Sequence, residues 1–361
     1  MATELFRTMF MELYREIRDP DMFLASLFTV RPGNISDTEK VKIDVVRGLE
    51  QISPVVGTCE GPTYNIADQF TTKEWTPPSI EEAMPFDCKE FLRRLPGQNE
   101  YDAADTGYQA ALIRRIADGA RAMEGKINRN RDWQASQLLQ TGIVTLVDET
   151  GATNYQVNFA PKGTHFVTAG TAWDAAGDPF GDIESMSDVI RTDSLLDADQ
   201  LIMGAGTFEA FMGNASVQAQ FDNRRINIGG IEPRNPVPGI GGKFQGNFHI
   251  GNYHYDLWTY NGQGIIPGAS TPTKFVAAES CIVRASAGRL DTVFAGVPMI
   301  VSPDPRFADI LPDRIAIPQA VDMAPNIWAQ PNGKQVMLEI ASRPLCIPTA
   351  IDSFGKINSG I

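Results

Sequence analysis

The chain has 361 residues, 43% of them hydrophobic, and a formal net charge of −13. This length and apolar content are enough for a sizeable core and predict two or three lobes. The acidic balance argues against a protein that grips nucleic-acid phosphates over a broad surface. Four cysteines show no CxxC spacing and no clustering with the three histidines, so we expect a reducing compartment with neither a disulfide framework nor a zinc site.

The start of the sequence lacks the features of an export signal, since no basic segment precedes an apolar core. No run approaches about 18 apolar residues, the length that a membrane-spanning helix requires. We therefore expect a soluble protein that does not cross a membrane.

The segment Glu4–Arg18 predicts a short amphipathic helix. Leu5, Met9 and Leu13 lie on one side, and the basic and acidic side chains balance. This differs from a cationic membrane-surface helix and favours docking on the same or a neighbouring subunit. Met22–Val30 offers a second apolar anchor.

A strand is predicted for Val41–Val46, followed by two extended arms, Gly48–Gly57 and Trp75–Met84. Between the arms lies a polar stretch, Thr58–Thr72, with little to bury. Because an extended two-stranded arm is only marginally stable alone, we expect it to lie against another part or another copy. A hairpin folded on its own domain is the alternative.

The longest helical pattern runs over Asp102–Thr141, and Gly142 stands where a left-handed terminating residue belongs. At about 1.5 Å per residue this is a rod of roughly 50 to 60 Å. Gly119 and Gly125 each weaken it by about 1 kcal/mol relative to alanine, so tertiary packing must hold it. Apolar residues recur every three to four positions and form one stripe: Tyr108, Leu112, Ile116, Ala120, Met123 and Ile127.

The rest of the chain predicts shorter elements. We expect a hairpin of Ile143–Val147 and Ala152–Phe159, whose turn carboxylates Asp148 and Glu149 serve the turn and not acid–base catalysis. The other expected elements are a helix at Asp182–Arg191, strands at Gln200–Met203, Lys274–Ala278 and Cys281–Arg284, a surface loop at Asn223–Gly246, and a hairpin of Ile327–Ala329 and Gln335–Ala341.

Two stretches suggest a ligand at first sight. Gly204-Ala205-Gly206 follows a strand and precedes a helix, as in dinucleotide-binding loops, but the third glycine is missing and Glu209 would lie near the pyrophosphate. We favour a tight strand-to-helix turn. His249 and His254 are five residues apart in one predicted strand, which would put them on opposite faces, so we do not expect them to share a metal.

Several runs resemble the major capsid proteins of tailed bacteriophages, in particular the lambda-type (protein E) family. The similarity covers nearly the whole chain in order and length and is weakest from Asn223 to Pro272. The residues that carry it are Thr38-Glu39-Lys40-Val41, Ser53-Pro54-Val55-Val56, Leu92-Arg93-Arg94-Leu95-Pro96, Trp173, Asp178-Pro179 and Asp182-Ile183.

The resemblance implies an α+β fold of the Hong Kong 97 type. Its parts would be an N-terminal arm (1–47), an extended loop (48–87), a peripheral domain (88–181) with the spine helix 102–141, an axial domain (182–325), and a return to the peripheral domain (326–361).

The resemblance also implies a structural function without enzyme activity or cofactor. Copies of the chain would form pentamers and hexamers of an icosahedral shell, assembled in the host bacterial cytoplasm, around double-stranded DNA that is not tightly bound. We expect a separate scaffolding protein, because no long charged helical extension precedes Asp19, and also a portal, with room for a decoration protein. The alternatives are an encapsulin-like nanocompartment and, more distantly, a dinucleotide-dependent enzyme that uses Gly204 and Gly206.

Contacts between subunits are expected from the first helix, the extended loop and the arginines of the spine, most of which should pair with acidic neighbours. The candidate residues are Leu5, Met9, Leu13, Thr58, Tyr64, Phe70, Trp75, Arg114, Arg115, Arg121, Arg129 and Arg131.

Overall fold

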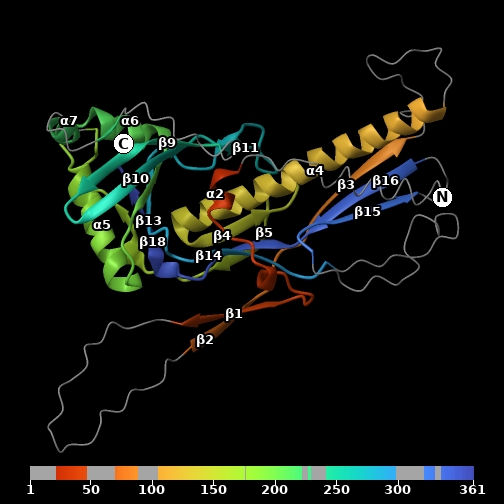
Figure 1. Cartoon of the computed structure of the whole chain (residues 1–361), viewed down its shortest axis with the longest axis horizontal. Helices are drawn as coiled ribbons and strands as arrows, with labels where there is room; N and C mark the ends of the chain where they lie inside the picture. Colours follow the sequence, from red (N-terminus) through yellow and green to blue (C-terminus); the bar gives the residue numbers. More distant parts are fainter. Residues whose placement is uncertain are drawn as a thin grey trace, which may run out of the picture.

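The structure is a computed structural model that describes residues 22–46, 70–87, 105–174, 176–221, 227–228, 241–297, 321–329 and 335–361. Helix α4, Asp105–Thr141, runs from the body of the molecule out along a narrow extension (Figure 1). Its 37 residues make a rod of about 55 Å. Gly142 ends it at φ +68°, and the Gly142 N–H donates to the Leu138 carbonyl at 2.8 Å. The predicted spine and its glycine terminator are therefore confirmed over the described part.

The outer part of the spine packs on a three-stranded antiparallel sheet. Its order is β15 (Ala324–Ala329), β16 (Gln335–Ser342) and β3 (Ile80–Asp87). Alternation along β16 puts one side chain in two toward the helix, including Leu338 and Ile340. The resulting cluster consists of Phe86, Ile116, Ala120, Met123, Ile127, Leu338 and Ile340.

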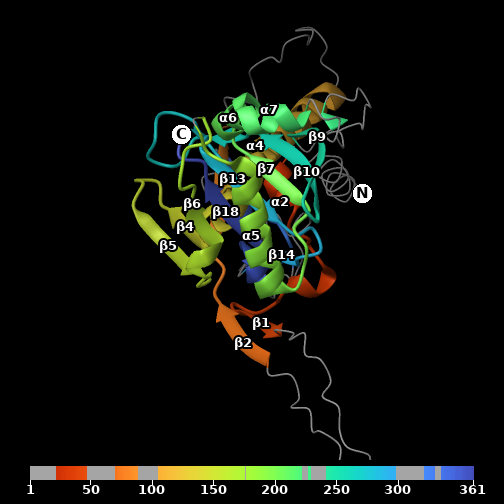
Figure 2. The ribbon, with the colours of Figure 1, turned by 90° about the vertical axis from the view of Figure 1, so that its left-hand side faces the viewer.

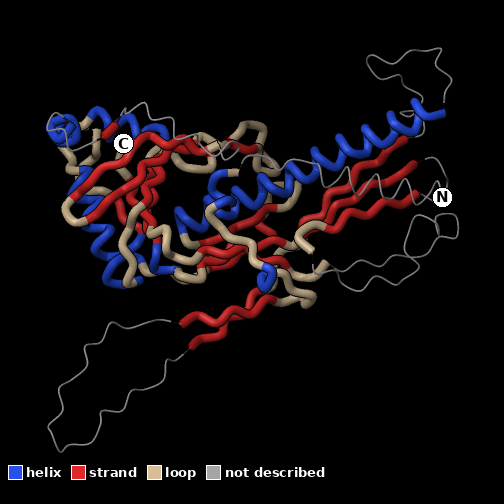
Figure 3. The backbone as a smooth tube through the Cα atoms, in the orientation of Figure 1, coloured by secondary structure: helices blue, strands red, loops and turns tan. Residues whose placement is uncertain are grey.

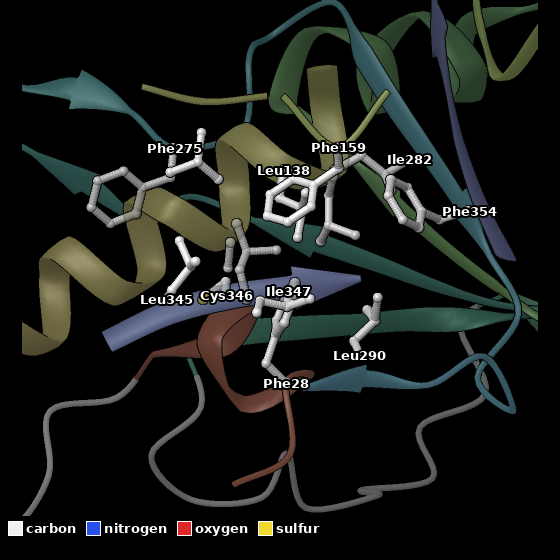
Figure 4. Close-up of a cluster of buried hydrophobic side chains, with 14 of the residues drawn as sticks. Phe28, Leu138, Phe159, Phe275, Ile282, Leu290, Leu345, Cys346, Ile347 and Phe354 are labelled. Atoms are coloured by element: carbon white, nitrogen blue, oxygen red, sulfur yellow. The ribbon is translucent and has the colours of Figure 1, made fainter. Parts of the chain in front are cut away.

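The inner part of the spine lies in the main core of the molecule (Figure 4). Apolar side chains from α4, the N-terminal segment and several strands meet there, including Phe28, Leu138, Phe159, Leu290 and Ile347. The elements around this core are α2 (Phe23–Ser26), β4 (Ile143–Val147), β5 (Thr153–Asn158), β14 (Leu290–Phe294), β17 (Pro344–Pro348), and 3-10 turns at Pro32–Asn34 and Ile351–Ser353.

A seven-stranded mixed sheet forms the far lobe, with helix α5 (Pro179–Ser194) across one face (Figure 2). Ile183, Met186 and Ile190 of α5 are buried against the sheet. In spatial order the strands are β6 (Phe166–Thr168), β18 (Phe354–Asn358), β13 (Ser280–Arg284), β7 (Gln200–Met203), β10 (Tyr253–Tyr260), β9 (Gly242–Ile250) and β8 (Asn227–Ile228).

Smaller elements complete this lobe, namely α6 (Ala205–Gly213), α7 (Ala215–Phe221) and a 3-10 turn at Gly163–His165. The strand pair β11 (Gln263–Gly264) and β12 (Thr273–Lys274) lies beside the spine instead (Figure 1). Trp173 is fully buried, and its indole N–H donates to the Asp182 carboxylate at 2.8 Å.

One strand pair stands apart from the body. β1 (Val41–Val46) and β2 (Phe70–Trp75) form an antiparallel ladder that projects away from the rest of the chain (Figure 3). The predicted arm Trp75–Met84 is interrupted after Trp75, because Pro77 and Pro78 lack the N–H groups that a ladder needs. β3 starts at Ile80 and pairs with β16, so it belongs to the sheet of the spine and not to the loop ladder. The division into domains otherwise stays a prediction.

Two further predictions are corrected. The loop expected to reach Gly246 ends earlier, because β9 begins at Gly242. A Cβ on Gly242 would lie 2.4 Å from the Phe23 ring, and Gly246 has φ +145° where the ladder to β10 is irregular, so both glycines serve a strand. The strand expected at Lys274–Ala278 stops at Lys274, since the next backbone groups bond elsewhere, as the Ala277 N–H does to the Gln140 side chain.

Candidate assembly surfaces

The projecting ladder has a defined outer end and a firmly held inner end. At the outer end Val46 pairs with Phe70, and at the inner end Val41 pairs with Trp75. The Trp75 ring packs on Phe159 with ring centres 5.5 Å apart. The ladder that flanks residues 47–69 is therefore fixed to the main core at its inner end.

Polar contacts hold the segment that follows β2. The Tyr155 hydroxyl donates to the Thr76 carbonyl at 2.7 Å, and burial raises the pKa of Tyr155 to about 12, so it remains a donor at neutral pH. Arg343, itself buried, donates to the carbonyls of Pro77 at 3.1 Å and Gly296 at 3.2 Å. The charge of the guanidinium strengthens both hydrogen bonds relative to those from a neutral donor.

The N-terminal arm is fixed at a three-way junction around Asp132 of the spine. One oxygen of this fully buried carboxylate accepts the Ala25 N–H at 2.8 Å, and the other accepts the Tyr260 hydroxyl at 2.6 Å. Phe23 stacks on Trp258 of β10 with ring centres 5.4 Å apart. The arm, the spine and the far lobe therefore meet at one side chain.

Burial dominates the electrostatics of this junction. Desolvation raises the pKa of Asp132, while hydrogen bonds from Tyr260 and Ala25 act in the opposite direction. Burial, together with the nearby Asp132 charge, also raises the pKa of Tyr260 and keeps its proton on the phenol. The sequence analysis did not single out Asp132. Its position among apolar residues of the helix, five residues after Ile127 and seven before Leu139, could have indicated a buried carboxylate.

A second carboxylate holds the arm further along. Asp291 of β14 is buried; its Oδ2 accepts Arg289 Nε at 2.5 Å and the Thr349 hydroxyl at 2.8 Å. Arg31 of the arm approaches Asp291 Oδ1 at 3.5 Å. Thr29 also forms a β-bridge with Asp291, so both backbone and charge bind this part of the arm to the core.

The arginines of the spine differ in their surroundings. Arg121 is exposed and approaches only the exposed Asp118 within the described contacts, at 3.4 Å, a pair worth little in water. Arg129 is also exposed, whereas Arg115 is half-buried. Arg131 lies over the Phe294 ring at 5.5 Å and donates to Asn128 Oδ1 at 3.1 Å, both within the same chain. Arg114 is in the helix, but its side chain lies outside the described part.

Arg129 also lines a groove of about 780 Å³ beside the spine. Trp133 contributes to the floor, and Ile265, which is 66% exposed, lies on the loop after β11 that forms one wall. Lys126 in the same groove is already paired with Glu82 at 2.9 Å. The lining therefore mixes apolar and polar side chains, and Arg129 has no acidic partner among the contacts of the described residues.

Five of the predicted contact residues, Leu5, Met9, Leu13, Thr58 and Tyr64, lie outside the described residues. Phe70 is placed at the outer end of the ladder, and Trp75 is half-buried at its inner end. An intersubunit role for all twelve candidates stays a prediction.

The glycine pair after β7 is not a phosphate-binding loop. Thr207 N–H and the Thr207 hydroxyl both donate to the Ala278 carbonyl, at 2.7 and 3.0 Å, so these donors near the start of α6 already have a backbone partner. A Cβ on Gly204 would lie 2.1 Å from the Ala277 carbonyl oxygen. The predicted tight turn is confirmed, and the glycine is needed for close approach of two backbone segments.

Within the described ranges, no three histidine, cysteine or acidic side chains are grouped to hold a metal ion. Cys281 and Cys346 are free and buried; burial raises the pKa of both thiols, that of Cys346 to about 12. A search of the same described ranges finds no helix both long and apolar enough to cross a membrane.

A family model described as phage major capsid protein E matches residues 12–358. The chain belongs to this family. It is a shell-forming capsid protein of a bacteriophage, and self-assembly into a virion shell follows from membership of the family. No curated protein matches the sequence.

A solved structure agrees with this assignment at the level of the fold. The crystal structure of a protein described as the capsid protein of a prophage of Escherichia coli CFT073 is 16% identical, with a TM-score of 0.64 and 97% of each chain covered. The capsid of cyanophage P-SCSP1u is 10% identical, with a TM-score of 0.49 over 94% of this chain and 89% of that chain. This capsid protein has the Hong Kong 97-type fold.

An encapsulin also appears among the similar structures. The encapsulin of Synechococcus elongatus PCC 7942 is 8% identical, with a TM-score of 0.44 over 96% of this chain and 89% of that chain. It represents a related fold only.

Proposed function

We propose that this capsid protein forms pentamers and hexamers that tile an icosahedral shell around the double-stranded DNA of a tailed phage. Assembly takes place in the host bacterial cytoplasm with a separate scaffolding protein and a portal. A decoration protein can be added to the finished shell. The chain acts as a structural protein without catalysis.

The observation that supports this proposal most directly is the projecting ladder of β1 and β2. Its base is anchored by Trp75, Tyr155 and Arg343, while the ladder itself extends away from the body (Figure 1). A two-stranded ribbon is marginally stable alone, so the loop beyond Val46 and Phe70 needs a surface on a second copy.

A second copy has candidate contacts on the spine. Arg121 and Arg129 are exposed, and neither has a strong acidic partner among the described contacts. Arg129 lines the groove that contains Trp133 and Ile265. We infer that an acidic, partly apolar segment of a neighbour lies there, and that Leu5, Met9 and Leu13 make a separate contact.

The register of the ladder allows a sharp test. Val46 and Phe70 are cross-strand partners, so replacing residues 47–69 by Asn-Gly closes a two-residue hairpin and leaves the base intact. We expect a soluble variant with unchanged thermal unfolding that forms no shells in negative-stain electron microscopy. A second variant with a Gly/Ser linker of the original length should also fail, since side chains and not length make the contact. Normal shells from the Asn-Gly variant would refute the assignment.

The same microscopy distinguishes the alternatives. Shells large enough for a genome, filled in the presence of scaffold and portal, support the proposal. Small shells that copurify with an enzyme would favour a nanocompartment. The dinucleotide-dependent enzyme lacks its main support, because the Thr207 N–H at the start of α6 already donates to the Ala278 carbonyl.

A further inference from the structure

Two histidines of the far lobe lie opposite each other on neighbouring strands. His249 of β9 and His254 of β10 are cross-strand partners, and their ring centres are 4.4 Å apart. The expectation that they lie on opposite faces of one strand is wrong. The chain reverses between them at Gly251, with φ +53°, so the spacing along a single strand does not apply.

Both imidazoles face solvent on a patch of polar side chains. His249 and His254 are exposed, and cross-strand partners point to the same face of an antiparallel pair. Asp256 and Asn247 form the next pair on that face, two residues further along each strand. Asp256 Oδ1 lies 4.0 Å from His254 Nε2, which places a negative charge beside the pair.

The opposite face of the hairpin is held rigidly. Phe248 and Tyr255 are buried in the cluster that includes α5. The Tyr253 hydroxyl donates to Asp188 of α5 at 2.7 Å, and the Tyr255 hydroxyl is within 2.5 Å of Ser187. The backbone that carries the histidines is therefore fixed, while their side chains can rotate in solvent.

We propose that His249 and His254 form a binding site for a divalent transition metal ion of the Cu²⁺, Ni²⁺ and Zn²⁺ class. Neutral imidazole is a preferred ligand for these ions. With metal–nitrogen bonds of about 2.0 to 2.1 Å, two imidazoles in neighbouring coordination positions have ring centres roughly 4.5 to 5 Å apart. The ring centres lie 4.4 Å apart with the planes tilted by 41°, so binding requires each ring to turn until one nitrogen of each points to the metal. Both side chains are exposed, which leaves room for this rotation.

Two ligands fill only part of a coordination shell. Because no third histidine, cysteine or acidic side chain completes the group among the described residues, the remaining positions go to water. The carboxylate of Asp256 favours the cation by its charge without being a ligand. The site is an addition to the shell-forming function and does not depend on the proposed loop contacts.

The test uses the full-length chain purified without a histidine tag, in a buffer that does not chelate metals. Ni²⁺ is titrated by calorimetry into the unaltered chain, into His249→Gln and His254→Gln, and into Lys243→Gln, a control at an exposed position of the same strand. We expect one equivalent of Ni²⁺ per chain. Since losing even an outer partner of a metal ligand costs about 10- to 100-fold in affinity, either histidine variant should bind at least about tenfold more weakly. Lys243→Gln should bind normally.

Electron paramagnetic resonance with Cu²⁺ provides a readout that does not depend on the variants. The unaltered chain should show coupling to two imidazole nitrogens, and each single variant to one. No Ni²⁺ binding by the unaltered chain, unchanged binding by either histidine variant, or a copper spectrum without two imidazole nitrogens would each overturn the proposal. A failure of shell assembly would leave these readouts intact, because they report on a single chain.

Discussion

A single buried carboxylate links three parts of this capsid protein. Asp132 accepts hydrogen bonds from Ala25 of the arm and Tyr260 of the far lobe, yet it forms no ion pair among the described residues. Desolvation raises its pKa, so ionised Asp132 is less stable in the folded chain than in the unfolded chain. The hydrogen bonds stabilise the junction, whereas the charge opposes folding.

Two substitutions separate these effects. Asp132→Asn keeps the shape and can still accept the Ala25 N–H, so its free energy of unfolding at pH 7 should equal or exceed that of the unaltered chain. Asp132→Ala leaves the Ala25 N–H and the Tyr260 hydroxyl unpaired and should cost about 2 to 4 kcal/mol. Both values come from chemical denaturation of the unassembled chain.

The pH dependence has a definite sign. A carboxyl whose folded pKa is raised binds its proton more tightly in the folded state, so stability falls as pH rises from about 3.9 through the raised folded value. In Asp132→Asn, the free energy of unfolding should lack the part of this decline with pH that Asp132 causes. If Asp132→Asn were as unstable as Asp132→Ala at pH 7, the charge itself would be required and this account would be wrong.

At the scale of elements, the spine depends on how closely β3 approaches it. A Cβ on Gly119 would lie 2.8 Å from Phe86 Cζ and 3.1 Å from Met84 Sδ, both on β3. A Cβ on Gly125 would meet only the Arg129 guanidinium, at 3.7 Å. Gly119 is therefore needed for the close approach of β3, whereas the surroundings of Gly125 leave space for a side chain.

Alanine substitution at the two glycines should have opposite effects. Alanine favours helix over glycine by about 1 kcal/mol, so Gly125→Ala should stabilise the chain by up to that amount. Gly119→Ala must displace Phe86 and should therefore destabilise the chain. Gly119→Leu should cost about 1 to 3 kcal/mol by overpacking. Thermal unfolding of the unassembled chain checks the order Gly125→Ala, Gly119→Ala, Gly119→Leu. Stabilisation by Gly119→Leu would show that β3 does not need this close contact.

At the scale of the whole molecule, the net charge of −13 bears on how the proposed shell would hold a genome. An acidic wall repels DNA phosphates and would let a duplex be packed without sticking. Among the spine arginines whose side chains the structure describes, Arg131 is engaged with Phe294 and Asn128, whereas Arg121 and Arg129 are exposed.

Unassembled subunits should therefore bind duplex DNA weakly at physiological salt. Each phosphate contact adds about −0.9 to the slope of log K against log salt concentration, so we expect a shallow slope in fluorescence anisotropy. Assembly itself should be salt-sensitive, because charges between subunits are screened. Tight binding with a slope steeper than about −5 would contradict this reading.

The sequence by itself determined the long helix, its end at Gly142, the hairpin after it, the strand Gln200–Met203 and the tight turn at Gly204. These features are local, because periodicity and turn chemistry act among residues close together in the chain. The family resemblance added the fold, the role of the long helix as the spine of that fold, and the shell-forming function.

Only the tertiary structure decided which distant segments are partners. Local patterns do not show that β3 pairs with β16 while β2 pairs with β1. The sequences of β2 and β3 both favour an extended strand, and neither pattern identifies the partner strand. They also do not show that Asp132 receives Ala25 and Tyr260, or that a turn brings His249 and His254 face to face. The physical reason is that the hydrogen-bond partners and the burial of Asp132 are set by residues a hundred or more positions away. For the two histidines, the chain reverses direction between them, so the two-residue period of a single strand does not apply.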